Sequence, residues 1–320
     1  MEFDGISLVT GAAGFLGRHL AERLAKSGVP LRAAVRPEED AGFLRALGAE
    51  VVRADLLDPE TLPLLFEGGV DRVFHLAAIC NLSTPYAVLH PANVLGVERI
   101  TWLALRSGVT RYVHMSSTAV YGPYRGRPFL EDSERTPGDD YGRSKFEGEE
   151  IVWEKIARGL PAVIARPCTV YGPGCTDGAG KVFSRPTSLL AIPGSGEQRL
   201  SNVRVEDVAA AAIHLSELDS AQGQAFNIAD DSHPELGEAL ALAAEAFGTR
   251  APRIHLPLGA IAAVAKLQGS IARLRGRIPD LEADAVRVLR DDYIVDNSKL
   301  KSTGYELLYP DFRASMKEIG

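Results

Sequence analysis

The sequence predicts an α/β protein, in which a doubly wound parallel sheet carries helices on both faces and a smaller, mostly helical C-terminal lobe follows. Up to residue 166, short apolar runs alternate with stretches of helical spacing, which is typical of a parallel sheet covered by helices. From residue 230 onward the spacing is mostly helical. Hydrophobic residues make up 46% of the 320-residue chain and charged residues 24%, so the chain can bury a core without disulfides.

The elements of the first half are bounded by turn residues. The apolar run 6–9 closes with a Thr-Gly pair and predicts a buried strand. Glycines end the helices expected at 15–27 and 38–47, and a proline stands in the first turn of the helix expected at 59–67. The other expected strands are 31–35, 50–54, 71–76, 111–115 and 162–165, and the other expected helices are 93–107 and 140–158.

The rhythm changes after residue 166. Residues 167–193 are rich in glycine and proline. Strands at 202–205 and 225–228, with a helix at 208–218 between them, extend the pattern of the first half. An alanine-rich helix is expected at 236–247. The tail therefore predicts a smaller lobe that caps the sheet.

Charge and composition exclude several classes of function. The formal net charge is −7 and aromatic residues are 7%, which argues against a nucleic-acid binder, because binding phosphates needs a basic face and binding bases needs aromatic platforms. Cys80, Cys168 and Cys175 form neither CxxC pairs nor a Cys/His array, so we expect no disulfide framework and no metal site. The acidic N-terminus lacks the basic start of a signal peptide, and no apolar run reaches the roughly 18 residues of a membrane span. We therefore expect a reduced, cytoplasmic chain.

A glycine-rich turn links the first strand to the first helix. Its sequence, Thr-Gly-Ala-Ala-Gly-Phe-Leu-Gly, spans residues 10–17. Small residues let the backbone turn sharply and approach a pyrophosphate, which then meets free N–H groups and the positive end of the helix dipole. Because the turn lies in a βαβ context, it predicts a dinucleotide site. The expected cofactor contacts in this turn are Gly11, Ala13, Gly14, Phe15, Leu16 and Gly17.

The ends of the next strands extend the cofactor site. An acid at the end of the second strand would accept a ribose 2′-hydroxyl, but Arg36 stands there and is suited to a 2′-phosphate. We therefore expect NADP(H) in preference to NAD(H). Asp55 follows the third strand, where it can accept a hydrogen bond from the adenine amino group, with Leu56 beside the ring. Small side chains at the fourth strand end leave room for the cofactor, and the contacts expected there are Leu76, Ala77 and Ala78.

A tyrosine and a lysine lie four residues apart on the helix expected at 140–158. Tyr141 and Lys145 therefore share one face, and the fifth strand delivers Ser117 to the same sheet edge. A tyrosine has a reference pKa of about 10, and a neighbouring ammonium together with a positively charged nicotinamide favours its phenolate. Lys145 is expected to supply that ammonium and to hold a ribose hydroxyl. Tyr141 would then move the proton on the substrate oxygen, and Ser117 would hydrogen-bond that oxygen, while hydride moves to or from a nicotinamide.

Seven sequence blocks carry a family resemblance. They are TGAAGFLG (10–17), DLLD (55–58), HLAA (75–78), NVLG (93–96), MSSTAVYG (115–122), YGRSK (141–145) and RPCTVYGPG (166–174). In this order they resemble the extended short-chain dehydrogenase/reductase superfamily, the NAD(P)-dependent epimerase/dehydratase family. The resemblance implies a Rossmann domain, a substrate lobe, and catalysis by Ser117, Tyr141 and Lys145. Ser117 is chosen because the family's catalytic hydroxyl precedes the glycine of VYG by five positions.

The resemblance also implies a division of the chain and further contacts. We expect residues 1–166 and about 196–229 to form the dinucleotide-binding Rossmann domain, and about 167–195 and 230–320 to form the substrate-binding cap lobe. A homodimer through the helices at 93–107 and 140–158 is expected by analogy. Further cofactor contacts are expected from Pro167 and Val170, and substrate contacts from Cys80, Thr118, Tyr171 and Arg204.

Two reactions stay open on the sequence. The turn Val-Arg-Pro-Glu at 35–38 and the block 166–174 resemble the 3β-hydroxysteroid dehydrogenase and dihydroflavonol reductase-like branches, which interconvert a secondary alcohol and a ketone on an apolar skeleton. The alternative is a nucleotide-sugar epimerase with tightly bound NAD. Such epimerases often carry Asn where this chain has Thr169, and Arg-Asp-Phe where it has Leu-Ser-Asn at 200–202, although Arg199 and Arg204 could still bind an anion.

Two further classes are less favoured. Sugar 4,6-dehydratases often have Asp-Glu where this chain has Thr118-Ala119, and a dinucleotide-binding sensor without turnover often lacks the tyrosine or the lysine. We therefore expect an oxidoreductase that acts on a moderately apolar small molecule. Residues 256–265 are apolar almost all round, with four basic residues beyond them. The simpler interpretation is a buried helix of the cap lobe; the alternative is an entrance for a lipid-like substrate or a contact with a membrane surface.

Overall fold

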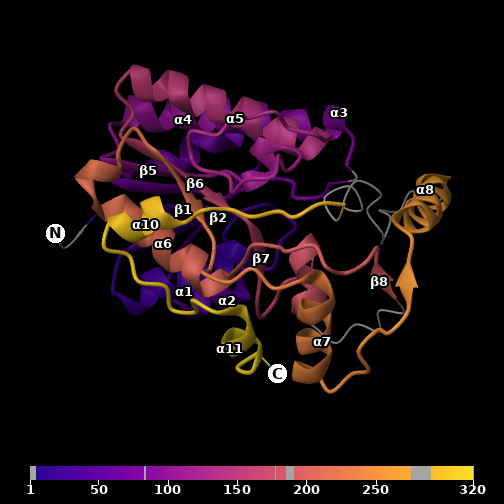
Figure 1. Ribbon diagram of the computed structural model, residues 1–320. Helices are drawn as coiled ribbons and strands as arrows, with labels where there is room; N and C mark the ends of the chain where they lie inside the picture. The colour runs from indigo at the N-terminus through magenta and orange to yellow at the C-terminus, as the bar shows by residue number, and fades with distance from the viewer. Residues whose placement is uncertain (1–4, 83, 177, 185–190, 275–289, 320) are drawn as a thin grey trace.

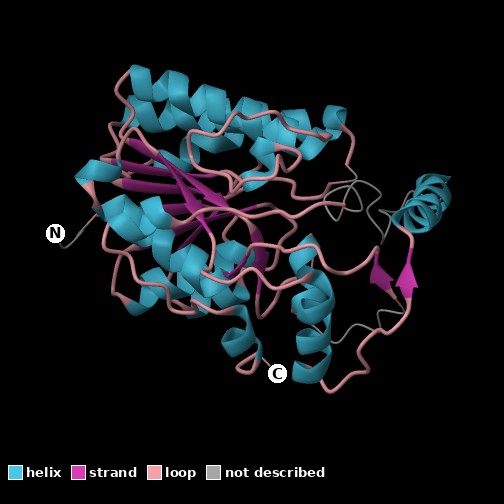
Figure 2. Cartoon of the chain, viewed as in Figure 1, coloured by secondary structure: helices cyan, strands magenta, loops and turns pink. Residues whose placement is uncertain are grey.

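The computed structural model describes residues 5–82, 84–176, 178–184, 191–274 and 290–319. Seven parallel strands form its central sheet in the order β10-β6-β5-β4-β1-β2-β3 (Figures 1 and 2). The strands are β1 (Ser7–Thr10), β2 (Leu31–Val35), β3 (Glu50–Arg53), β4 (Arg72–His75), β5 (Arg111–Met115), β6 (Ala162–Pro167) and β10 (Ala225–Ile228). The predicted doubly wound parallel sheet is confirmed.

Helices cover both faces of this sheet, as Figure 2 shows. On one face lie α1 (Phe15–Lys26) and α6 (Val205–Glu217), which pack against each other over one apolar core. On the other face lie α4 (Gly96–Ser107) and α5 (Asp140–Ala157) over a second core. Because the central strands are buried on both faces, they read as nearly continuous apolar runs.

Two helices of the first half differ from the expectation. The helix expected at 38–47 is only α2 (Gly42–Ala46), because the preceding loop is held open: Arg53 Nη1 donates to the carbonyl oxygens of Arg36, Pro37 and Glu39 at 2.7, 3.1 and 2.6 Å. The segment expected as a helix at 59–67 is η1 (Pro59–Phe66), a 3₁₀ helix with a second proline inside it.

The helix expected at 93–107 is longer than the sequence indicated. It follows without a break from α3 (Tyr86–His90) through η2 (Pro91–Leu95), a π-helical turn, into α4. The expectation began at Asn93 and so left out α3 and the first two residues of the π-helical turn. The helix ends at Gly108, whose φ of 69° is the left-handed conformation of a helix C-cap.

The remaining elements lie mainly beside the carboxyl ends of the strands. The strand expected at 202–205 is β9 (Asn202–Arg204), which pairs with β7 (Thr169–Tyr171) outside the main sheet. A third apolar core joins this pair to two C-terminal helices, α7 (Leu236–Ala246) and α11 (Phe312–Met316). The other short elements are η3 (Thr118–Tyr121), η4 (Ala179–Phe183), β8 (Ile192–Pro193), η5 (Asp219–Ala221), β11 (His255–Leu256), α8 (Leu258–Leu274) and α10 (Ser298–Ser302).

The C-terminal tail returns to the main sheet. Asp207, buried in α6, accepts hydrogen bonds from the Tyr305 hydroxyl and from the backbone N–H groups of Leu308 and Tyr309, at 2.8, 2.8 and 2.9 Å. The expected division of the chain at residues 166, 195 and 229 stays a prediction. None of the helices in the described ranges combines the length and hydropathy needed to cross a bilayer.

Candidate active site

The carboxyl ends of the parallel strands meet at one edge of the sheet, and the predicted site residues follow them. Thr10, at the end of β1, ties two of these ends together: its Oγ1 accepts from the N–H groups of Leu76 and Ala77, both at 3.2 Å, and shares a 2.8 Å hydrogen bond with His75 Nδ1. Burial lowers the pKa of His75 to about 3, so this ring is neutral. Thr10 thus positions the end of β4, a role that the sequence motifs did not indicate.

The glycine-rich turn is compact enough to bring its backbone against the sheet edge. Gly11 has a φ of 68°, and a Cβ on it would lie 2.9 Å from the Ala77 backbone. A Cβ on Gly17 would lie 2.1 Å from the Gly11 carbonyl oxygen. α1 then begins with no side-chain cap and no acid in its first turn, so its N–H groups and positive dipole end stay available. This cradle fits the pyrophosphate of a dinucleotide.

The other expected cofactor residues lie around the same edge. Leu56 packs over Gly96 of α4, where a Cβ would come within 2.9 Å of the leucine side chain. The Asp55 carboxylate accepts the Leu57 N–H at 2.9 Å, which orders the turn after β3. Pro167 is the last residue of β6. The remaining members are Ala13, Gly14, Phe15 and Leu16 in the turn, Leu76, Ala77 and Ala78 after β4, and Val170 in β7.

Arg36 is held by its own loop. Its Nε and Nη2 donate to Glu39 Oε1 at 3.1 and 3.0 Å, and its Nη1 lies 3.1 Å from Glu38 Oε1. The Glu39 carboxylate also accepts the Arg36 backbone N–H at 2.9 Å. The Arg36 side chain lies just after β2, as expected, and is 56% exposed. Two carboxylates already pair with its charge. The sequence pattern did not anticipate these two partners.

Four of the predicted site residues lie close together at this sheet edge: Tyr141, Ser117, Lys145 and Cys80. Tyr141 is buried in the first turn of α5, and the Cys80 thiol donates to its hydroxyl oxygen at 3.5 Å. The Ser117 side chain hydrogen-bonds the same hydroxyl. Lys145 Nζ donates to the Met115 carbonyl at 2.6 Å, which places the amine under the end of β5. The structure therefore brings together the three predicted catalytic side chains and one predicted substrate contact.

Burial dominates the electrostatics of this group. Burial raises the pKa of Tyr141 well above 10, the neighbouring Cys80 raises it further, and the Ser117 hydrogen bond opposes this only in part. Burial also lowers the pKa of Lys145 to about 8, against the influence of Cys80 and Glu149. Desolvation is thus the largest influence on the Tyr141 pKa in this structure, and the expected lowering by Lys145 together with a bound nicotinamide stays a prediction.

Asn93 braces the loop that carries Cys80, a role that sequence reasoning missed. Its side-chain amide accepts the Ile79 N–H at 2.8 Å and donates to the Ile79 carbonyl at 2.9 Å. The same amide donates to Ser144 Oγ at 3.0 Å, and Ser144 in turn donates to the Tyr141 carbonyl at 2.8 Å. Asn93 thus ties the end of β4 to the first turn of α5. The signal was the asparagine of the NVLG block, whose other members are apolar or glycine.

A buried ion pair behind the site was also missed. Glu149, one turn beyond Lys145 on α5, is fully buried and accepts from Arg166 Nε and Nη2 at 2.9 and 2.7 Å. It also accepts from the Ser116 hydroxyl and from Arg135 Nη1 at 3.1 Å. Arg166 Nη1 donates to the Tyr121 hydroxyl at 2.9 Å. A charged residue in the apolar strand 162–167 was the available signal, because a buried arginine needs a partner.

The other predicted substrate contacts lie in packed surroundings. Thr118 is buried, and its carbonyl accepts the Tyr293 hydroxyl at 2.6 Å. Tyr171 is fully buried, and its ring lies 4.9 Å from that of Phe312. Arg204 stacks 3.8 Å over the Tyr309 ring and donates to Glu206 at 3.1 Å. In the described part of the chain these side chains serve packing, and their contact with substrate stays a prediction.

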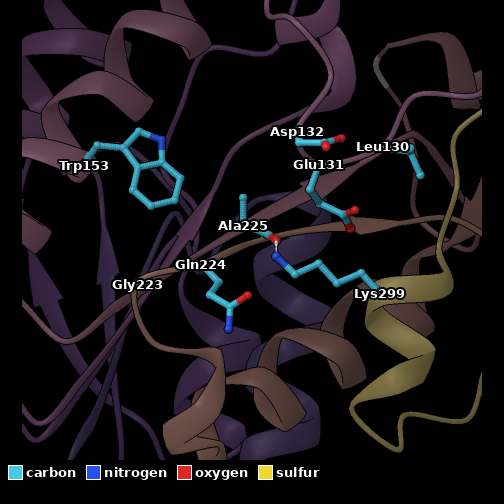
Figure 3. A pocket seen from close by; sticks show the side chains of 8 residues that line it. All are labelled: Leu130, Glu131, Asp132, Trp153, Gly223, Gln224, Ala225 and Lys299. Carbon is cyan, nitrogen blue, oxygen red and sulfur yellow. Dashed lines mark hydrogen bonds between the residues drawn. The ribbon is translucent and has the colours of Figure 1, made fainter.

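A separate groove lies along the free edge of β10 (Figure 3). Its volume is about 520 Å³, and it is lined by Leu130, Glu131, Asp132, Trp153, Gly223, Gln224, Ala225 and Lys299. Figure 3 shows Lys299 reaching the Ala225 carbonyl, to which it donates at 2.9 Å. Glu131 accepts the Asn227 N–H at 2.8 Å. These two side chains cover the backbone groups of an edge strand, a structural role.

Comparison with known proteins agrees with this geometry. Residues 7–229 match the NAD dependent epimerase/dehydratase family. A 4-hydroxy-2-methyl-3-oxo-4-farnesyl-3,4-dihydroquinoline-1-oxide ketoreductase from Stigmatella aurantiaca is 30% identical over 93% of this chain and 91% of its own length. Sterol demethylase protein B from Methylococcus capsulatus is 28% identical over 92% of this chain and 90% of its own.

A solved structure shows the same fold over almost the entire chain. MoeE5 in complex with UDP-glucose and NAD is 27% identical, with a TM-score of 0.76 over 98% of both chains. Members of the family include NAD-dependent oxidoreductases and epimerases. The matched residues include the glycine-rich turn, Ser117, Tyr141 and Lys145 at one sheet edge, and the chain belongs to the NAD dependent epimerase/dehydratase family.

Proposed function

We propose that this protein is an NADP(H)-preferring reductase that interconverts a ketone and a secondary alcohol on a moderately apolar small molecule. The observation that carries the proposal is the group formed by Tyr141, Ser117 and Lys145 beside the glycine-rich cradle. The ketoreductase and sterol demethylase relatives support an apolar substrate by their names alone.

Each side chain has a distinct task in the proposed reaction. Tyr141 donates its hydroxyl proton to the substrate oxygen during reduction. Ser117 hydrogen-bonds that oxygen, and Lys145 holds a ribose hydroxyl of the cofactor. A bound nicotinamide supplies the hydride when the carbonyl is reduced.

An epimerase acting on a nucleotide sugar is the second candidate, supported by the likeness to MoeE5 with UDP-glucose and NAD. A sugar diphosphate needs free cationic side chains. Arg199 Nε and Nη2 instead donate to Asp292 at 3.1 and 2.7 Å, and Arg204 is buried beside Glu206. The two arginines that kept this alternative open on the sequence already have acidic partners, as Arg36 does, so this pairing does not decide between the two candidates.

The function is tested with purified protein, whose retained cofactor is first identified by mass spectrometry. Consumption of NADPH and NADH is then followed with a panel of apolar ketones, including steroid ketones, and with UDP-sugars. We expect NADPH consumption with apolar ketones and none with UDP-sugars. Retained NAD⁺ together with epimerisation of a UDP-sugar and no net NADH would show that the second candidate is correct.

Cofactor preference depends on Arg36 and its two carboxylates. Arg36→Asp is expected to shift the kcat/KM ratio toward NADH by about ten- to hundredfold, the worth of a hydrogen bond to a charged group. Glu39→Gln, which releases the guanidinium, is expected to shift it toward NADPH. Arg158→Asp, an exposed arginine at the far end of α5, is the matched control. Unchanged ratios in both test variants would remove Arg36 from cofactor recognition.

A further inference from the structure

The segment 249–274 is basic within an acidic chain. It contains Arg250, Arg253, Lys266 and Arg273 and no Asp or Glu, although the whole chain has a net charge of −7. The segment includes β11 and α8, which Figure 1 shows at the edge of the molecule, next to β8 and apart from the main sheet. An acidic protein thus carries a basic segment at its edge.

The same projection exposes large apolar side chains. Ile254, Leu256, Val264 and Leu267 are 64%, 41%, 51% and 63% exposed. They are four of the ten large apolar side chains exposed in the described part of the chain, gathered within 14 residues. A cluster of this kind marks an interaction surface, whereas single exposed apolar residues are ordinary. We call these four side chains, with Arg250 and Arg253, the α8 patch.

The exposed residues follow the period of the helix. Ala260, Val264 and Leu267 recur at i, i+4 and i+7, so they form one stripe along α8, and all three are exposed. Ala265, on a different face, is buried. The buried helix favoured on the sequence is therefore wrong for this segment, because the outward stripe of α8 is itself apolar. A helix in water normally turns such a stripe inward, so its outward direction calls for an apolar partner.

We propose that the α8 patch docks the protein on the surface of an anionic lipid bilayer. Apolar side chains enter the boundary between headgroups and acyl chains, while Arg250 and Arg253, both exposed, meet the negative headgroups. Charge complementarity selects this occupant. A second copy of the chain would bring two basic segments together, and a nucleic acid offers no apolar layer for Val264 and Leu267. The proposal stands independently of the proposed reaction.

The test is flotation of the full-length protein with vesicles. Phosphatidylcholine vesicles containing about 30 mol% phosphatidylglycerol are compared with pure phosphatidylcholine vesicles at low salt, and self-association is followed by light scattering. We expect the protein to bind anionic vesicles at least fivefold more tightly than neutral vesicles, because each basic residue near the membrane surface contributes roughly fivefold to the affinity. Binding is also expected to weaken with salt.

Two variants address the two parts of the patch. Leu267→Glu is expected to lower vesicle binding roughly tenfold or more, the effect of losing one buried leucine. Arg250→Glu with Arg253→Glu is expected to abolish the preference for anionic vesicles. Leu130→Glu, at an exposed leucine outside the patch, is the matched control for the apolar change. Three results of the flotation assay would overturn the proposal: no binding, equal binding to neutral vesicles, or binding that Leu267→Glu does not change. Self-association that Leu267→Glu removes, without any binding to vesicles, would overturn it as well.

Discussion

Tyr141→Phe is expected to lower kcat for ketone reduction about a thousandfold, within the range attributed to general acid catalysis. The substitution removes only the hydroxyl that Cys80 and Ser117 contact. The ring keeps its buried position at the start of α5, so the affinity for the cofactor should change little. The measurements are kcat and KM at saturating NADPH, with the dissociation constant for NADPH measured separately by fluorescence.

A second tyrosine provides the control. The Tyr112 hydroxyl in β5 is buried and has no hydrogen-bond partner within the described ranges. Tyr112→Phe should therefore leave both kcat and cofactor affinity near the values of the unchanged protein. Normal turnover in Tyr141→Phe would contradict the proposed proton donor, whereas equal losses in both variants would point to a general effect of removing a buried hydroxyl.

Glu149→Leu is expected to destabilise the protein by about 3–5 kcal/mol, the typical effect of breaking a buried ion pair from one side. Arg166 would keep its charge inside the protein with only the Tyr121 hydroxyl and the Glu131 carbonyl as partners. Ser116 would also lose the bond that joins the end of β5 to α5. The free energy of unfolding is measured by urea denaturation.

Two comparisons separate the ion pair from a general effect of the substitution. The double variant Glu149→Leu with Arg166→Met should recover much of the loss, because neither charge is then left alone. Glu150→Leu, at the neighbouring and half-exposed glutamate that pairs with Arg135, should cost less than about 1 kcal/mol. A double variant no more stable than Glu149→Leu alone would show that the pair is not the source of the loss.

The sequence was sufficient for most elements because their signals are local. Apolar runs buried on both faces identified the central strands, and glycines after helices identified several ends. The errors have local causes as well. Arg53 reaches back across three carbonyls and shortens the helix expected at 38–47, and a π turn carries the helix through Pro91. Both depend on contacts that no residue pattern displays.

The sequence by itself determined the sheet, the glycine-rich turn and the meeting of Ser117, Tyr141 and Lys145. Parallel strands place their carboxyl ends at one edge, and a spacing of four residues places two side chains on one helix face. The tertiary structure alone decided the burial of Tyr141, the carboxylates that hold Arg36 and the outward face of α8. These properties depend on burial and on which side chains the fold brings together. Desolvation depends on the folded surroundings of a residue, so neither the residue type nor its spacing reveals it.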